Sequence, residues 1–200
     1  MINVTNFNKG IISSSVGSFW WGVIGTYYFQ YIAFVGTFEV VAHRCIWTTL
    51  ILLITTTFFN KWHLFKEIII NKKKLFVLFI TSFLIFGNWT IWIYAVATNR
   101  IIDASFGYFI FPIISVFFGF IFFKEELNKK RIISIILVII SIIYLLFNFD
   151  SLPWVGFAVA FLWSIYNLLR KKINVDTDIG LFIESLFILP LAIIILYFII

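Results

Sequence analysis

Hydrophobic residues dominate the chain in seven long runs, and polar or charged residues gather in the short gaps between them. A helix needs about 20 predominantly apolar residues to cross a bilayer, because each residue adds only about 1.5 Å to its length. The pattern therefore predicts an all-α polytopic membrane protein with seven transmembrane helices. The predicted spans are residues 10–32, 40–59, 75–98, 104–123, 132–147, 152–169 and 179–200.

The composition supports this fold class and excludes others. Charged residues make up 12% of the chain, against about 25% in a soluble domain. The mean hydropathy of +1.08 is too high for a soluble domain to bury so much apolar surface. A net charge of +6 invites a nucleic-acid interpretation, but no basic stripe alternates with aromatic residues on a polar surface. We therefore expect the lipid bilayer as a partner and no nucleic acid.

Positive charges fall in alternate gaps. The second, fourth and sixth gaps hold twelve of the fifteen lysine and arginine residues, and Lys9 precedes the first span. Basic loops stay on the cytoplasmic side of a membrane, so the pattern predicts a cytoplasmic N-terminus and cytoplasmic even-numbered gaps. Arg44 and Arg100 are then the two positive residues that face the outer side.

A weak internal repeat links the first span to the sixth. The segment around Trp21 resembles the segment around Trp163, and an ionisable position follows each Trp by some twenty residues, His43 in one case and Glu184 in the other. A repeat of five spans ends on the opposite side of the membrane from its start, because five is odd. The second copy must therefore be inverted, as in many secondary transporters. Chance similarity between two apolar helices remains the alternative.

The repeat sets the expected domain organisation. Residues 10–149 would form a first five-helix repeat, and residues 150–200 would begin a second, inverted one. The chain stops at Ile200 inside an apolar stretch, without a polar residue at the membrane interface. We therefore expect a C-terminally incomplete transporter that lacks three helices.

Ionisable residues inside the second and seventh spans are candidates for function. A charge in the middle of a membrane costs about 2.5–3.5 kcal/mol on insertion scales, so it should face a partner or a wet cavity. His43 and Arg44 lie about one turn deeper than Glu39, where an ion pair and a substrate or proton site are both open interpretations. Glu184 is the deepest acid and a candidate for proton coupling.

The third and fourth spans carry polar stripes. Ser105, Tyr108 and Pro112 share one helical face, and Asn88 and Trp92 share another. Close helix packing explains small and polar stripes, and so does a substrate pathway. Pro112 also frees a backbone carbonyl that needs a partner or water.

Neither an enzyme nor a cofactor site is expected. The sequence contains no recognisable nucleophile motif and no glycine-rich phosphate loop. The single cysteine, Cys45, excludes an internal disulfide, and Glu39 with His43 offers too few ligands for a metal.

Six groups of residues occur in an order typical of one family. They are 42–47, 87–89, 104–110 with Pro112, 151–153, 169–173, and 183–184 with 189–190. From about Gly10 on, the chain resembles the RarD branch of the EamA-type drug/metabolite transporter superfamily. Two positions depart from the family pattern: Lys124 stands where glycine commonly precedes an acid, here Glu125, and Phe111 stands where the branch often has asparagine.

The resemblance implies a fold of ten helices in two inverted repeats and a permease of the bacterial plasma membrane. Relatives are named for chloramphenicol sensitivity or resistance, so small organic metabolites or drugs are the implied substrates. His43, Arg44, Asn88, Ser105, Tyr108, Pro112 and Glu184 match family motif positions.

The resulting hypothesis is a secondary transporter that works by alternating access. Trp21 and Trp92 would form aromatic walls, Asn88 and Tyr108 would supply hydrogen bonds, and Glu184 or His43 would carry coupling protons. The alternative is a non-transporting membrane subunit or scaffold whose polar stripes serve helix packing. The substrate, the direction of transport and the oligomeric state are left open.

Overall fold

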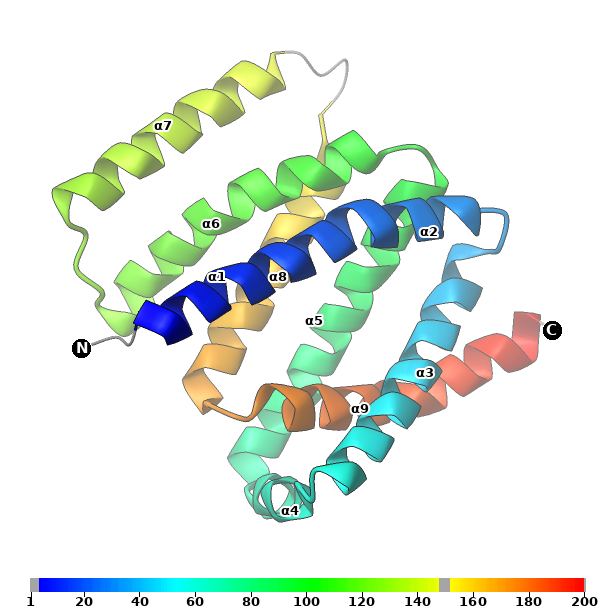
Figure 1. Cartoon of the computed structure of the whole chain (residues 1–200). Coiled ribbons are helices and arrows are strands. Elements are labelled where there is room, and N and C mark those ends of the chain that lie inside the picture. The colour runs from blue at the N-terminus through cyan, green and yellow to red at the C-terminus, as the bar shows by residue number, and fades with distance from the viewer. Residues whose placement is uncertain (1–3, 148–151, 200) are drawn as a thin grey trace.

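A computed structural model describes residues 4–147 and 152–199, and this part of the chain is helical throughout, without a β-strand. The all-α prediction is confirmed. Residues 148–151, which include Ser151 of the family motif, and Ile200 at the end of the seventh predicted span lie outside the described residues. The elements, shown in Figure 1, are α1 (Val4–Phe19), the π-helix η1 (Trp20–Gly25), α2 (Thr26–Tyr31), α3 (Thr37–Phe58), α4 (Trp62–Ile70), α5 (Lys72–Ala97), α6 (Ile101–Phe123), α7 (Lys129–Leu146), α8 (Trp154–Ile173) and α9 (Thr177–Ile199).

Each predicted span coincides with helical structure. Four helices, α3, α5, α6 and α9, are long and apolar enough to cross a membrane. The other three predicted spans differ from these in detail: the first is interrupted by η1, α7 begins with three basic residues and α8 ends with three. The second gap, expected as a loop, contains the short helix α4.

Asparagine residues mark several helix boundaries. Asn71 and Asn128 accept hydrogen bonds from the backbone N–H groups of Lys74 and Arg131, which caps the starts of α5 and α7. Asn60 and Asn99 have positive φ angles just after α3 and α5, a conformation that asparagine tolerates better than most residues. Polar residues in the gaps therefore end the helices as well as face water.

The basic gaps meet at one end of the molecule, here called the basic end. Lys61, after α3, pairs with Asp176, before α9, at 3.4 Å. Lys171 near the end of α8 pairs with Glu125 after α6 at 2.5 Å. Figure 1 shows α4 and the α8–α9 turn at this end, and the α2–α3 and α5–α6 turns at the opposite end.

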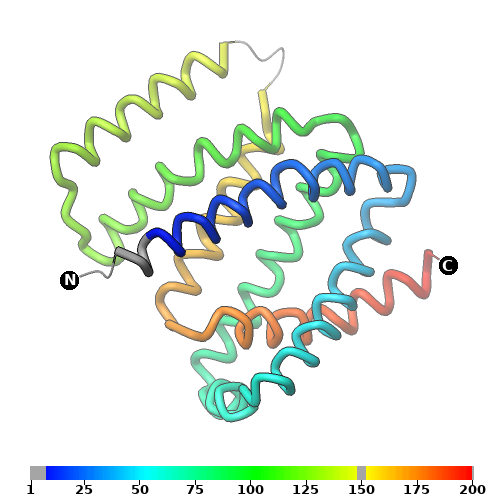
Figure 2. Tube along the Cα trace, viewed as in Figure 1, coloured from blue at the N-terminus to red at the C-terminus, as the bar shows by residue number. Residues whose placement is uncertain are grey.

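The helices pack around α5, which contacts α3, α6, α8 and α9. The most extensive pairs are α3 with α9 and α6 with α8, and the tube in Figure 2 shows α9 crossing α3. Gly107 of α6 lies against Gly156 of α8, where a Cβ on Gly107 would come within 2.5 Å of the Gly156 carbonyl oxygen. Only glycine allows the two backbones to approach so closely.

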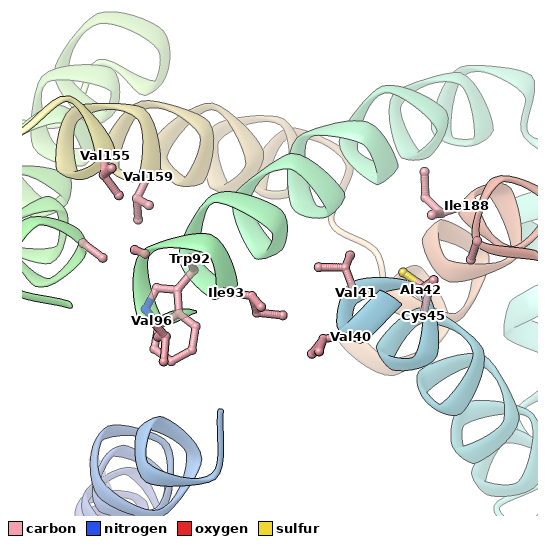
Figure 3. Close-up of a cluster of buried hydrophobic side chains, with 13 residues drawn as sticks. Val40, Val41, Ala42, Cys45, Trp92, Ile93, Val96, Val155, Val159 and Ile188 are labelled. Atoms are coloured by element: carbon pink, nitrogen blue, oxygen red, sulfur yellow. The ribbon is translucent and has the colours of Figure 1, made fainter. Parts of the chain in front are cut away.

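The main core lies where α3, α5, α8 and α9 meet. Figure 3 shows Val41 and Cys45 of α3, Ile93 of α5, Val159 of α8 and Ile188 of α9 as part of one buried cluster. By contrast, α7 has no buried residue, and many of its apolar side chains are exposed. Exposed apolar side chains of this kind fit a lipid environment.

Candidate functional site

A cavity of about 280 Å³ lies between η1, α3, α5, α6 and α8. We call it the central cavity. Its lining combines one positive charge, two polar side chains and four indole rings: Trp21, Arg44, Asn88, Trp89, Trp92, Tyr108 and Trp163. Five of these seven, Trp21, Arg44, Asn88, Trp92 and Tyr108, are residues proposed from the sequence.

Arg44 is the only charged residue in this lining. The carbon at the centre of its guanidinium lies 4.1 Å from the ring centre of Trp89, 5.0 Å from that of Trp21 and 5.8 Å from that of Phe29. These are cation–π contacts, which stabilise a cation that has lost its water. The Nη1 atom is buried and has no hydrogen-bond partner.

The π-helix places Trp21 in the cavity wall. The first span is continuously helical from Val4 to Tyr31, but residues Trp20–Gly25 adopt the wider π-helical turn. Such turns are rare and often occur at functional sites. The Trp21 ring lies 5.2 Å from that of Trp92, and Trp21 lines the cavity together with Tyr108 of α6. Trp21 thus joins the first span to α5 and α6.

Asn88 connects the cavity to α8. Its amide N–H donates to the backbone carbonyl of Val159 over 3.2 Å, and the side chain is almost fully buried. An amide at this depth needs such a partner. Asn88 thus links two helices and also lines the cavity, and its role in substrate recognition stays a prediction.

Glu184 lies outside the central cavity in a separate buried cluster between α5, α8 and α9. Its carboxylate accepts hydrogen bonds from Thr81 at 2.6 Å and Tyr166 at 3.1 Å, and Arg170 Nε lies 3.7 Å away. The side chain is fully buried. Two hydroxyl donors and one cation thus offset part of the cost of burying this carboxyl group.

Two stacked rings connect the central cavity to this cluster. Trp163 lines the cavity and stacks on Tyr166, with ring centres 5.2 Å apart and planes at 13°. Tyr166 in turn donates to Glu184. Trp163 and Tyr166 of α8 therefore link the central cavity to the carboxylate of Glu184 on α9.

The remaining predicted site residues lie elsewhere. His43 is exposed and lines a second cavity of about 570 Å³ with Glu39 and Arg44. Ser105 is exposed and lies outside both cavities. Pro112 borders a third cavity, between α6 and α7. The polar stripe of the fourth span is thus divided among different surfaces, and α6 packs on α8 through Gly107.

Sequence reasoning missed the cation that pairs with Glu184. Arg170 is part of a basic run with Lys171 and Lys172, and it was assigned to membrane topology with them. Its guanidinium occupies the space beside Gly180, where even a Cβ would collide with it. The lack of a side chain at Gly180 was the one available signal, and it has meaning only once α8 and α9 are placed together.

No metal site was expected, and in the described part of the chain no three His, Cys, Asp or Glu side chains gather in a way that could hold an ion. Cys45 is a buried free cysteine in the core. Its role there is packing, as a small apolar side chain.

Helices long and apolar enough to cross a membrane thus contribute a charged residue and aromatic walls to one cavity. The chain belongs to the EamA-like transporter family, which matches residues 8–147. This confirms the family resemblance seen in the sequence, and it makes the chain a multi-pass bacterial membrane protein.

Relatives confirm the RarD branch. The chain is 34% identical to Protein RarD of Escherichia coli, over 94% of the chain and 64% of that protein. It is 35% identical to an uncharacterized transporter of Vibrio cholerae, over 92% and 61%, and 31% identical to the uncharacterized transporter YojE of Bacillus subtilis, over 92% and 62%. The chain thus spans somewhat less than two thirds of the length of these relatives. No solved structure shows a significant match.

Proposed function

We propose that the chain forms the larger part of a secondary transporter that moves small organic molecules, with the central cavity as its substrate site. The observation that carries this proposal is the composition of the cavity. Residues from the first predicted repeat, including Arg44, Asn88 and Tyr108, meet Trp163 from the second around one space. Substrate sites of inverted-repeat transporters lie at such a repeat interface.

The positions of the buried charges support inverted repeats. Arg44 and Glu184 each lie seven residues after the first residue of their helices, α3 and α9. These helices are the second spans of the two proposed repeats, and they pack against each other extensively. Two equivalent helices that start at opposite ends and contact each other are what a two-fold axis in the membrane plane requires.

The proposed orientation places the basic end in the cytoplasm together with the N-terminus. Lys61, Lys171 and Arg131 all take part in ion pairs at that end. The positive-inside rule assigns such a cluster to the cytoplasmic side.

Glu184 is the proposed proton-coupling group. The path from Trp163 through Tyr166 gives a physical connection between an occupied cavity and the carboxylate. A shift of the Trp163 ring upon substrate binding would move Tyr166 and change the stabilisation of the Glu184 charge. His43, the second candidate, is exposed and lines the neighbouring cavity.

Drug-like molecules are one proposed substrate group. A relative in Pseudomonas aeruginosa is named chloramphenicol-sensitive protein RarD. The central cavity of about 280 Å³ lies just below the range of about 300–1,000 Å³ that is typical of small-molecule sites. It therefore suits a small metabolite or drug.

The scaffold alternative predicts that the polar stripe of α6 serves helix packing. Ser105 and Tyr108 are exposed, however, whereas Gly107 makes the close contact with α8. Ser105→Leu and Tyr108→Phe should therefore leave the protein folded in the membrane. Loss of folding in both variants would favour the scaffold.

Alternating access is tested by cysteine labelling of the protein in bacterial membranes. Cys45→Ala removes the native thiol, and Tyr108→Cys then places one thiol in the central cavity. A charged, membrane-impermeant thiol reagent should label Tyr108→Cys both in intact cells and in inside-out vesicles. The control is Val159→Cys, a fully buried core position that should stay unlabelled. Labelling of Tyr108→Cys from neither side, or from one side only, would contradict the proposal.

A further inference from the structure

We propose that the central cavity selects small, flat organic anions and binds their carboxylate to Arg44. This inference rests on the proposed function and adds the substrate class to it. It is carried by the contacts of the Arg44 guanidinium and by the shape and chemistry of the space beside it.

The charge of Arg44 is uncompensated in the described part of the chain. The ion pairs found there all join other residues, and none of the side-chain hydrogen bonds found there involves the Arg44 guanidinium. An unpaired charge inside a membrane protein costs several kcal/mol, so such residues normally have a partner. Arg170 shows the usual solution, since it pairs with Glu184.

Nearby acids do not fill this role. Glu39 lies on the same helix and borders the neighbouring cavity, yet it makes no ion pair with Arg44. Asp103 at the start of α6 pairs with Arg100. An anion that enters from outside the protein would supply the missing charge.

At least one nitrogen of the guanidinium is available to this anion, because Nη1 is buried and has no hydrogen-bond partner. The central carbon of the guanidinium lies over the rings of Trp89 and Trp21, 4.1 and 5.0 Å from their centres. The N–H groups of a guanidinium lie in its plane and point outward from its edge. A carboxylate accepts two such N–H bonds side by side in that plane, which is the geometry that arginine recognises best.

The other lining groups fit the rest of such a ligand. Indole rings of Trp21, Trp89, Trp92 and Trp163 form broad apolar walls, which suit a flat ring. Tyr108 and Asn88 add polar groups that can orient it. The described lining contains no acid, so it offers a cation no partner of opposite charge.

Benzoate and benzamide provide a matched pair of probes. They have the same size and shape, but only benzoate carries a negative charge at neutral pH. Binding to the purified protein in detergent is followed by its tryptophan fluorescence, because four of the eight tryptophans line the cavity. We expect benzoate to bind at least tenfold more tightly than benzamide.

Three variants connect this preference to Arg44. Arg44→Gln should remove the preference, so that benzoate binds no better than benzamide, whereas Arg44→Lys should retain part of it through its charge. Arg100→Gln is the control, since Arg100 pairs with Asp103 at the opposite end from the basic end and lies outside the cavity. A thermal unfolding transition shared by all three variants and the unmodified protein shows that each is folded.

The possible binding results test the proposed substrate class and the proposed function separately. If both probes bind equally tightly and Trp92→Ala abolishes this binding, the anion preference is overturned. The cavity then remains the proposed substrate site. A benzoate preference unchanged in folded Arg44→Gln would overturn the role of Arg44. Failure of both probes to bind the folded protein overturns the anion proposal, and the labelling of Tyr108→Cys then decides the proposed function independently.

Discussion

At the scale of single residues, two buried charges of opposite sign are stabilised in different ways. Glu184 has two hydroxyl donors and Arg170 around it. Arg44 has aromatic rings over its guanidinium and no ion pair in the described chain. The first charge has a counter-charge within the protein, whereas the second has none among the described residues. This contrast separates the proposed coupling group from the proposed substrate-binding group.

Replacement of Glu184 tests its coupling role. Glu184→Gln keeps the size of the side chain but cannot ionise, so transport should lose its dependence on a pH gradient. The same change leaves Arg170 without its counter-charge, which costs about 3–5 kcal/mol for a buried pair. The measurement is transport into proteoliposomes with and without a pH gradient, together with thermal unfolding.

The double variant Glu184→Gln/Arg170→Gln separates coupling from stability. It removes both charges, so unfolding should return toward that of the unmodified protein, while the pH dependence stays absent. Normal pH dependence of transport in a folded variant that lacks the Glu184 carboxylate would rule out the coupling role.

At the scale of elements, glycine decides how closely α6 and α8 approach. A Cβ on Gly156 would lie 2.4 Å from the backbone oxygen of Asp103 and 3.1 Å from the backbone nitrogen of Gly107. A backbone cannot move aside as a side chain can. At the end of α6, Lys124 adopts a left-handed conformation with φ of 52°, which suits the glycine that the family resemblance implies at this position.

Alanine at Gly156 should push α8 away from α6. We expect Gly156→Ala to lower the free energy of unfolding by about 1–3 kcal/mol, the usual cost of overpacking. Gly87→Ala is the matched control, because a Cβ there makes only an ordinary contact of 3.6 Å with Leu162. That control should be neutral or stabilising by up to about 1 kcal/mol, since alanine favours helix more than glycine does. Unfolding in detergent measures both, and equal stability of the two variants would refute the close-contact argument.

At the scale of the whole molecule, ion pairs join distant helices at the basic end. Glu125 after α6 pairs with Lys171 of α8 at 2.5 Å and lies 3.8 Å from Arg131 of α7. Lys61 connects the α3–α4 turn to Asp176 and Asp178. These contacts hold the ends of helices from both proposed repeats together.

The Glu125 contact should depend on pH. A hydrogen bond from Lys171 and the charge of that lysine hold the pKa of Glu125 below its ordinary value of 4.5. A carboxyl with a lowered pKa stabilises the fold at pH values above its ordinary pKa and loses this effect as the pH falls through the lowered one. The unmodified protein should therefore unfold at a higher temperature than Glu125→Gln at pH 7, and the difference should be smaller at pH 3.

The adjacent acid Glu126 provides the control. Its side chain is exposed, and only its backbone carbonyl accepts a hydrogen bond, from Arg131. Glu126→Gln should match the unmodified protein at both pH values. If the unfolding temperature of Glu125→Gln lies below that of the unmodified protein by the same amount at pH 3 as at pH 7, the ion pair is not the cause of the difference.

The sequence by itself determined the fold class, the approximate spans, the gathering of basic gaps and the family. These follow from the length of apolar runs and from the placement of charges, because the bilayer constrains both along the chain. It also identified residues such as Arg44 and Asn88, since a polar group at depth needs a partner whatever the packing.

Only the tertiary structure decided which helix faces meet. It divided the stripe of Ser105, Tyr108 and Pro112 among different surfaces, and it brought Arg170 to Glu184 beside Gly180. The physical reason is that lipid and protein interior are both apolar, so hydrophobic periodicity in a membrane helix does not mark the packed face. That choice depends on close contacts between residues far apart in the chain, such as Gly107 and Gly156, and these exist only in the folded bundle.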